Sequence, residues 1–109
     1  MADDLAERHK IDQLKALLER EPDDEVALFG LSNAYLTLKQ DEEAITALDR
    51  CIQVTPDYSA AYQALAVALS KSGQIDRSRE SGHKGIDVSR AKGDLMVAKP
   101  LEHVLGQIA

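Results

Sequence analysis

The sequence has one cysteine, no tryptophan and no long apolar run. The single cysteine, Cys51, excludes an intramolecular disulfide and gives zinc no second thiolate ligand. No apolar run approaches the ~18 residues that a membrane span needs, and the start MADDLAERHK lacks the apolar core of a secretory signal. We therefore expect a soluble protein that stays in a reducing cytoplasm.

Aromatic residues are scarce, at 4% of the 109 residues, whereas hydrophobic residues make up 44%. A core built mainly from Ala, Leu, Ile and Val favours helices that pack closely on small side chains. The length suffices for one domain with a modest core and is too short for two. The composition therefore predicts a single all-α domain.

Basic residues are also in deficit, since the formal net charge is -6. A phosphate backbone would be repelled, so nucleic-acid binding is disfavoured. Residues 1–57 hold fourteen acids and six bases, whereas residues 58–109 hold five acids and seven bases. We interpret this asymmetry as solvated helix faces; the alternatives are an end that recruits an acidic partner and head-to-tail self-association.

The sequence repeats itself with a period of 34 residues. Each copy carries an apolar stripe with helical spacing after a proline, then a polar break and a second stripe. The proline ends the preceding helix, and the aspartate after it, Asp23 or Asp57, can cap the next. The matched pairs are Pro22 and Pro56, Asp23 and Asp57, Ala27 and Ala61, Leu31 and Leu65, Ala34 and Ala68, Gln40 and Gln74, Ile52 and Ile86, and Val54 and Val88.

This period and pattern resemble the tetratricopeptide repeat. The residues that carry the resemblance are Leu28, Leu31, Tyr35, the EEAI of 42–45, Leu48, Cys51 and Pro56, and in the second copy Tyr62, Leu65, Ala66 and Leu69. The second copy departs from the pattern at Ser78, Gly82 and Arg90. The resemblance implies antiparallel helix-turn-helix repeats stacked as a short right-handed superhelix, without cofactors.

Flanking helices complete the predicted stack. We expect helices near residues 4–20, 24–38, 41–54, 58–72, 75–91 and 95–108. One domain, 1–109, then comprises an N-terminal half repeat at 1–22, repeats at 23–56 and 57–91, and a capping helix at 94–109. Pro100 either kinks the last helix, which we favour, or marks its start near Lys99.

Candidate catalytic and metal-binding residues are isolated. His9, His83 and His103 fall on three different predicted helices, and none has a second ligand at helical spacing. Cys51 occupies a small slot of the repeat, which indicates a structural thiol. The acids of PDDE and DEE begin helices and lack the spacing of a calcium loop. We therefore predict no enzyme activity, no metal and no cofactor.

The family resemblance implies a concave groove, lined by the first helix of each repeat, that binds a peptide or a partner helix. The predicted groove residues are Val26, Phe29, Asn33, Leu36, Thr37, Gln63, Val67, Ser70 and Lys71, with Ala60 beside them. Alternatively, a terminal helix covers these residues and they belong to the core. The carboxylate clamp of co-chaperones in this family is not expected, because Phe29 replaces its first lysine and Ala64 its second asparagine.

The stretch SGHKG, residues 81–85, places two glycines in a predicted helix. It matches neither a phosphate loop nor a metal site. Because interior glycines cost a helix about 1 kcal/mol each, we expect either local bending or a compensating close contact. The contact that we predict is with the terminal helix, through Leu95, Val97 and Leu101.

These features predict a non-catalytic adaptor that binds another protein. Two alternatives remain open: a dedicated chaperone or assembly factor for a secretion or surface-appendage subunit, and a structural protein that self-associates through its ends.

Overall fold

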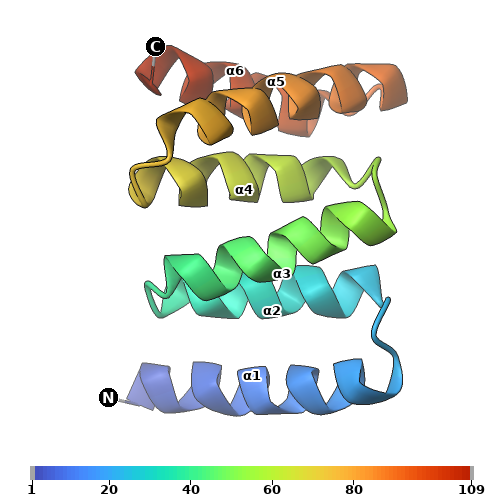
Figure 1. Ribbon diagram of the computed structural model, residues 1–109, viewed down its shortest axis with the longest axis vertical. Helices are drawn as coiled ribbons and strands as arrows, with labels where there is room; N and C mark the ends of the chain where they lie inside the picture. Colours follow the sequence, from blue (N-terminus) through green and yellow to red (C-terminus); the bar gives the residue numbers. More distant parts are fainter. Residues whose placement is uncertain (1, 109) are drawn as a thin grey trace.

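The computed structural model describes residues 2–108, and within them six helices are joined by short turns (Figure 1). They are α1 (Ala2–Arg20), α2 (Glu25–Thr37), α3 (Asp41–Val54), α4 (Ser59–Lys71), α5 (Ile75–Lys92) and α6 (Leu95–Ile108). All six helices predicted from the sequence are present, and the predicted ends differ from these by no more than two residues. The all-α prediction is confirmed.

The helices stack in chain order from one terminus to the other, so that the two ends of the chain lie at opposite ends of the molecule (Figure 1). Each helix packs against the next one. In addition, α2 contacts α4 and α4 contacts α6, so these three form a continuous layer. The second helices of the repeats, α3 and α5, cover one side of that layer and leave its other side to solvent.

Two turns differ from the expectation in detail. The cap of α2 is Asp24 and not Asp23, because the Asp24 carboxylate accepts a hydrogen bond of 3.0 Å from the Ala27 N–H. Asp23 instead pairs with Arg50 of α3. No side-chain cap begins α4, where Asp57 accepts a bond from the Lys92 ammonium through its backbone carbonyl.

The core consists of small and branched side chains, as the composition predicts. Ala44, Leu48, Cys51, Ala61 and Leu69 are fully buried, at 0% exposed. Burial raises the pKa of the Cys51 thiol to about 11, with a smaller contribution from the Glu25 carboxylate. The thiol donates weakly to the Glu25 carbonyl across 3.6 Å. Cys51 is therefore a structural residue.

The glycines of α5 lie where the chain packs most closely, and the predicted contact with the terminal helix is confirmed. A Cβ added at Gly82 would lie 2.8 Å from Leu105 Cδ2, and one added at Gly85 would lie 2.7 Å from Leu101 Cδ1. The prediction for Leu95 is wrong, since its side chain is 60% exposed. Val97 is buried in the same cluster as Leu101.

A second close neighbour of Gly85 was not predicted. A Cβ there would lie 2.5 Å from the Cβ of Tyr62 on α4, so this glycine brings α4 and α5 together as well as α5 and α6. Pro100 lies inside α6, which begins at Leu95 and not near Lys99.

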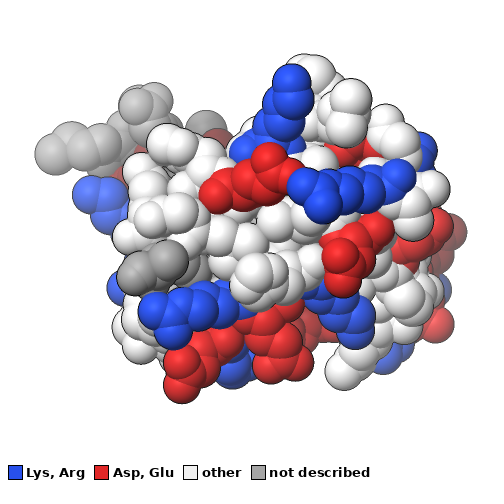
Figure 2. Space-filling view, turned by 90° about the horizontal axis from the view of Figure 1, so that it is seen from above, with Lys and Arg blue, Asp and Glu red and all other residues white. Residues whose placement is uncertain are grey.

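The two end helices combine polar and apolar exposed residues. Lys10 and Gln13 of α1 are exposed, whereas the residues 34 positions later, Ala44 and Ala47, are buried in the core. At the other end, basic and acidic side chains lie among uncharged ones on the surface that α5 and α6 close (Figure 2). Exposed polar residues of this kind are typical of terminal caps in a helical repeat, but Leu5 of α1 and Met96 of α6 are also exposed.

Candidate functional site

The side of the stack formed by α2, α4 and α6 carries two adjoining hollows, which together we call the inner groove. The first has a volume of about 270 Å³ and lies between α2 and α4. Its lining is mostly apolar, with two amide side chains among the aliphatic and aromatic groups. The lining residues are Phe29, Asn33, Leu36, Ala60, Gln63, Ala64 and Val67.

Phe29 is fixed at one end of this hollow. Its ring centroid lies 5.2 Å from that of Tyr58, with the two rings tilted by 37°. Tyr58 directly precedes α4, so this contact joins the start of the second repeat to the first helix of the first repeat. Phe29 therefore presents a positioned aromatic surface and is only half-buried.

The second hollow continues the groove towards α6. It has a volume of about 310 Å³, and its lining residues are Val67, Ser70, Lys71, Val104 and Gln107. Val67 belongs to both hollows, so it marks the point where they meet. Lys71 is the one residue with a formal charge among the described lining residues of the groove.

Seven of the nine predicted groove residues line these hollows: Phe29, Asn33, Leu36, Gln63, Val67, Ser70 and Lys71. Val26 and Thr37 do not. Val26 is 66% exposed on the same helix, and the exposed Thr37 hydroxyl donates to the Asn33 carbonyl at 3.0 Å.

The sequence reasoning missed Val104 and Gln107, because it drew the groove from the first helices of the two repeats and treated the last helix as a cap. The period of 34 could have identified Val104, which stands 34 positions after the predicted groove residue Ser70. It could not have identified Gln107, which falls opposite Gly73 at that offset. The terminal helix thus forms a wall of the second hollow and does not cover the first.

The described residues contain no group of His, Cys, Asp and Glu that could hold a metal ion. His9, His83 and His103 are exposed on α1, α5 and α6. None of the helices in residues 2–108 combines the length and the apolar character required to cross a bilayer.

Comparisons with known proteins agree with this geometry. The family model of the tetratricopeptide repeat matches residues 26–68. A TPR repeat-containing protein of Pseudomonas aeruginosa is 29% identical over 91 residues, which are 84% of this chain and 87% of that protein. Residues 26–68 thus match the tetratricopeptide repeat, and the chain is similar over most of its length to a small protein that carries this repeat.

Solved structures support the same fold. The TPR2B domain of yeast Sti1, in its complex with pHsp70, matches with a TM-score of 0.85 over 99% of this chain and 97% of that one, at 14% identity. A protein of Bordetella parapertussis matches with a TM-score of 0.78 over 90% of this chain and 85% of that one, at 26% identity. An all-helical repeat of this family is a protein-interaction module.

Proposed function

We propose that the protein binds an extended peptide or a helix of another protein in the inner groove and catalyses no reaction. The observation that carries this proposal is the groove itself, two adjoining hollows of about 270 and 310 Å³ with a mainly apolar lining. Apolar pockets with a few placed polar groups are typical of sites that recognise peptides.

The polar groups of the groove suit an uncharged backbone. Asn33 and Gln63 each carry an amide that can donate and accept, which fits the N–H and C=O groups of a peptide. Phe29, Leu36 and Val67 would take apolar side chains of the ligand. The partner segment is therefore expected to be apolar over most of its length.

The groove does not support recognition of a terminal carboxylate by a cluster of cations. Phe29 and Ala64 occupy its first hollow where such a clamp has lysine and asparagine, and Lys71 alone brings a positive charge to the second. The pHsp70 complex of the yeast Sti1 domain is a property of that domain. We expect a different ligand for this chain.

The test is affinity capture of partners from the native cell with the full chain, followed by titration of the strongest partner. Phe29→Ala should weaken binding by about tenfold or more, because truncating an aromatic anchor removes about 1.4 kcal/mol or more. Val26→Ala, on the same helix but outside the hollows, is the matched control and should bind normally.

A loss of stability could imitate a loss of binding, since Phe29 also contacts the core. Asn33→Ala avoids this difficulty, because the Asn33 side chain is exposed. Both variants are checked by thermal unfolding. Normal binding by Phe29→Ala and Asn33→Ala, with only the first destabilised, would mean that the groove is core surface and not a site.

The adaptor hypothesis and the chaperone hypothesis differ in their effect on the partner. Without a dedicated chaperone the client aggregates or is degraded, whereas an adaptor's partners stay soluble. Self-association is the third hypothesis: Lys10 and Gln13 make part of α1 polar, whereas Leu95 and Met96 leave apolar side chains exposed on α6. Light scattering over a concentration and salt series tests it: growth of mass with concentration would favour a self-associating protein.

A further inference from the structure

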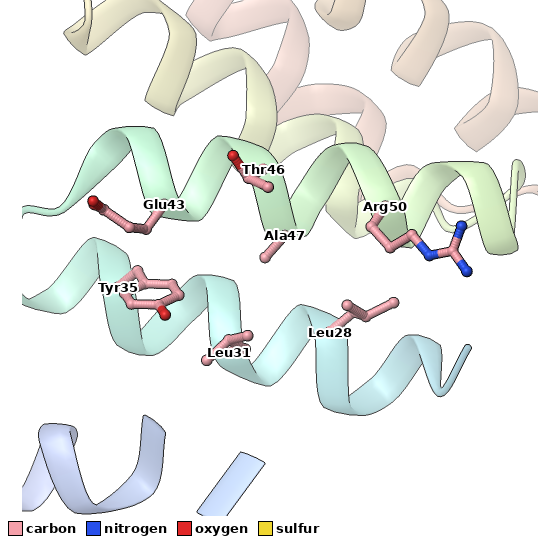
Figure 3. A pocket seen from close by; sticks show the side chains of 7 residues that line it. All are labelled: Leu28, Leu31, Tyr35, Glu43, Thr46, Ala47 and Arg50. Carbon is pink, nitrogen blue, oxygen red and sulfur yellow. The ribbon is translucent and has the colours of Figure 1, made fainter. Parts of the chain in front are cut away.

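A third hollow, which we call the outer hollow, lies on a different face of α2 from the inner groove. Its volume is about 350 Å³, and it lies between α2 and α3 (Figure 3). Leu28, Leu31 and Tyr35 line it from α2, and Glu43, Thr46, Ala47 and Arg50 line it from α3. None of these residues belongs to the inner groove.

The second repeat contains the same hollow in a smaller form, with a volume of about 140 Å³. Six of the residues that line it stand 34 positions after residues of the outer hollow: Tyr62, Leu65, Arg77, Glu80, Ser81 and Lys84. The two hollows are therefore the same site of the repeat, and the chain supplies its own comparison between a small copy and a large one.

The preceding helix narrows the copy in the second repeat. There α3 contributes Asp49 and Ile52 to the lining, and the Arg77 guanidinium binds the Asp49 carboxylate at 3.3 Å. In the first repeat α1 precedes, and its residues in the same register, Lys15 and Leu18, are not among the described lining residues. The Lys15 ammonium instead lies 5.8 Å from the centre of the Tyr35 ring.

This difference leaves the apolar lining slightly more exposed in the first repeat. Leu28, Leu31 and Tyr35 are buried but keep 6–8% of their surface exposed, whereas their counterparts Tyr62, Leu65 and Leu69 keep 0–4%. In the second repeat the preceding helix presents an aliphatic side chain, that of Ile52, to the lining of the hollow. A helix with aliphatic side chains therefore matches the shape of the outer hollow.

The length of the outer hollow also suits a helix. Seven residues separate Leu28 from Tyr35, and seven separate Glu43 from Arg50. At 1.5 Å per residue this is about 10 Å, or two turns. A bound helix could present apolar side chains at positions i, i+3 and i+7 along it.

The charges around the outer hollow favour a basic occupant. Glu43 is exposed at the Tyr35 end, and Arg50, the one cation among the described lining residues, is already paired with Asp23. The Lys15 ammonium near this end lies over the Tyr35 ring and does not line the hollow. Residues 1–57, which include the whole hollow, hold fourteen acids and six bases. Such a surface attracts a cationic segment and repels an acidic one.

We propose that the outer hollow is a second docking site, which takes a basic amphipathic helix of a partner protein. Its aliphatic side chains enter between α2 and α3, and a lysine or arginine of the helix faces Glu43. The site is separate from the inner groove, so the chain can hold two segments at the same time, one on each face of α2.

The test uses the full chain labelled with nitrogen-15 and a designed helical peptide with leucines at i, i+3 and i+7 and lysines on its other faces. Amide shifts are expected over residues 28–35 and 43–50. Glu43→Lys should weaken binding by about fivefold, as reversal of an exposed charge at a contact does, and Thr46→Arg should block it. Glu42→Lys makes the same charge change outside the hollow and should have little effect.

Two further peptides complete the design: one with glutamates in place of the lysines, and one with the leucines moved off the i, i+3, i+7 spacing. Both should bind at least tenfold more weakly. The proposal is overturned if either of these peptides binds as tightly as the first, or if no peptide binds at millimolar concentration. It is also overturned if Glu42→Lys weakens binding as much as Glu43→Lys does, or if the amide shifts centre on Gln63 and Val104 of the inner groove. Because all three substituted side chains are exposed, thermal unfolding is expected to show intact folds.

Discussion

Replacing Gly85 with alanine tests the close packing of α5 most directly. The new Cβ would lie 2.5 Å from the Tyr62 Cβ and 2.7 Å from Leu101 Cδ1, whereas carbon atoms pack favourably at about 3.5–4.0 Å. Tyr62 cannot turn aside, because its Cβ is attached to the backbone of α4 and its hydroxyl donates to the Pro56 carbonyl at 2.6 Å. Relief therefore requires α4 and α5 to move apart by about 1 Å.

Overpacking of this kind costs about 1–3 kcal/mol, and the better helix propensity of alanine returns about 1 kcal/mol. Because the Tyr62 Cβ cannot turn aside, the upper part of that range, about 2–3 kcal/mol, applies, and we expect Gly85→Ala to lower the free energy of unfolding by about 1–2 kcal/mol. For a domain of this size that is a fall in Tm of roughly 4–12 °C.

Gly82→Ala is the matched substitution one turn earlier. Its Cβ would lie 2.8 Å from Leu105 Cδ2, the far end of a half-buried side chain that can rotate. The clash is therefore relieved at small cost, and the gain in helix propensity makes this variant about as stable as the parent or up to about 1 kcal/mol more stable.

Urea unfolding followed by circular dichroism measures both variants. A parent-like midpoint for Gly85→Ala would refute the close-packing argument, and equal losses for the two variants would show that mobility of the neighbouring side chain does not decide the outcome. Gly82→Leu, which is too large for rotation of Leu105 to accommodate, should displace α6 and lower stability by more than Gly82→Ala does.

Two further predictions concern a turn and the thiol. Lys39 has a φ of 60°, and the residue 34 positions later, Gly73, has a φ of 84°. Lys39→Gly should therefore remove backbone strain and stabilise the protein by up to about 1 kcal/mol. Thermal unfolding measures this change, and a lower Tm would contradict the prediction. Burial raises the pKa of Cys51 from 9.0 to about 11, so the folded state holds the thiol proton more tightly than the unfolded state over that range. The free energy of unfolding should therefore fall as the pH rises from 9 towards 11, and it should fall less steeply in Cys51→Ala; parallel pH profiles of the two proteins would disprove it.

The helices and their order could be predicted from the sequence because both depend on local patterns. Apolar residues three and four apart define each helix, and Pro22 and Pro56 mark where helices end. The period of 34 then implies that equivalent side chains occupy equivalent places, which is why most of the inner groove could be assigned by residue number. The same reasoning predicted that Cys51 and the α5 glycines lie where neighbouring helices leave room only for small side chains.

What the sequence could not decide depends on how helices lie against one another. The neighbour of Gly85 on α4 and the contribution of Val104 and Gln107 to the groove depend on distances between helices. Asp23 pairs with Arg50 of α3, and Asp24 caps α2. The outer hollow is the clearest case. Most of its lining residues stand 34 positions before those of the smaller hollow in the second repeat. The two hollows differ because α3 adds Asp49 and Ile52 to the smaller one, whereas Lys15 and Leu18 of α1 do not line the larger one. The spacing of apolar residues along the sequence determines where helices form. The width of a hollow depends instead on packing between helices that are distant in sequence.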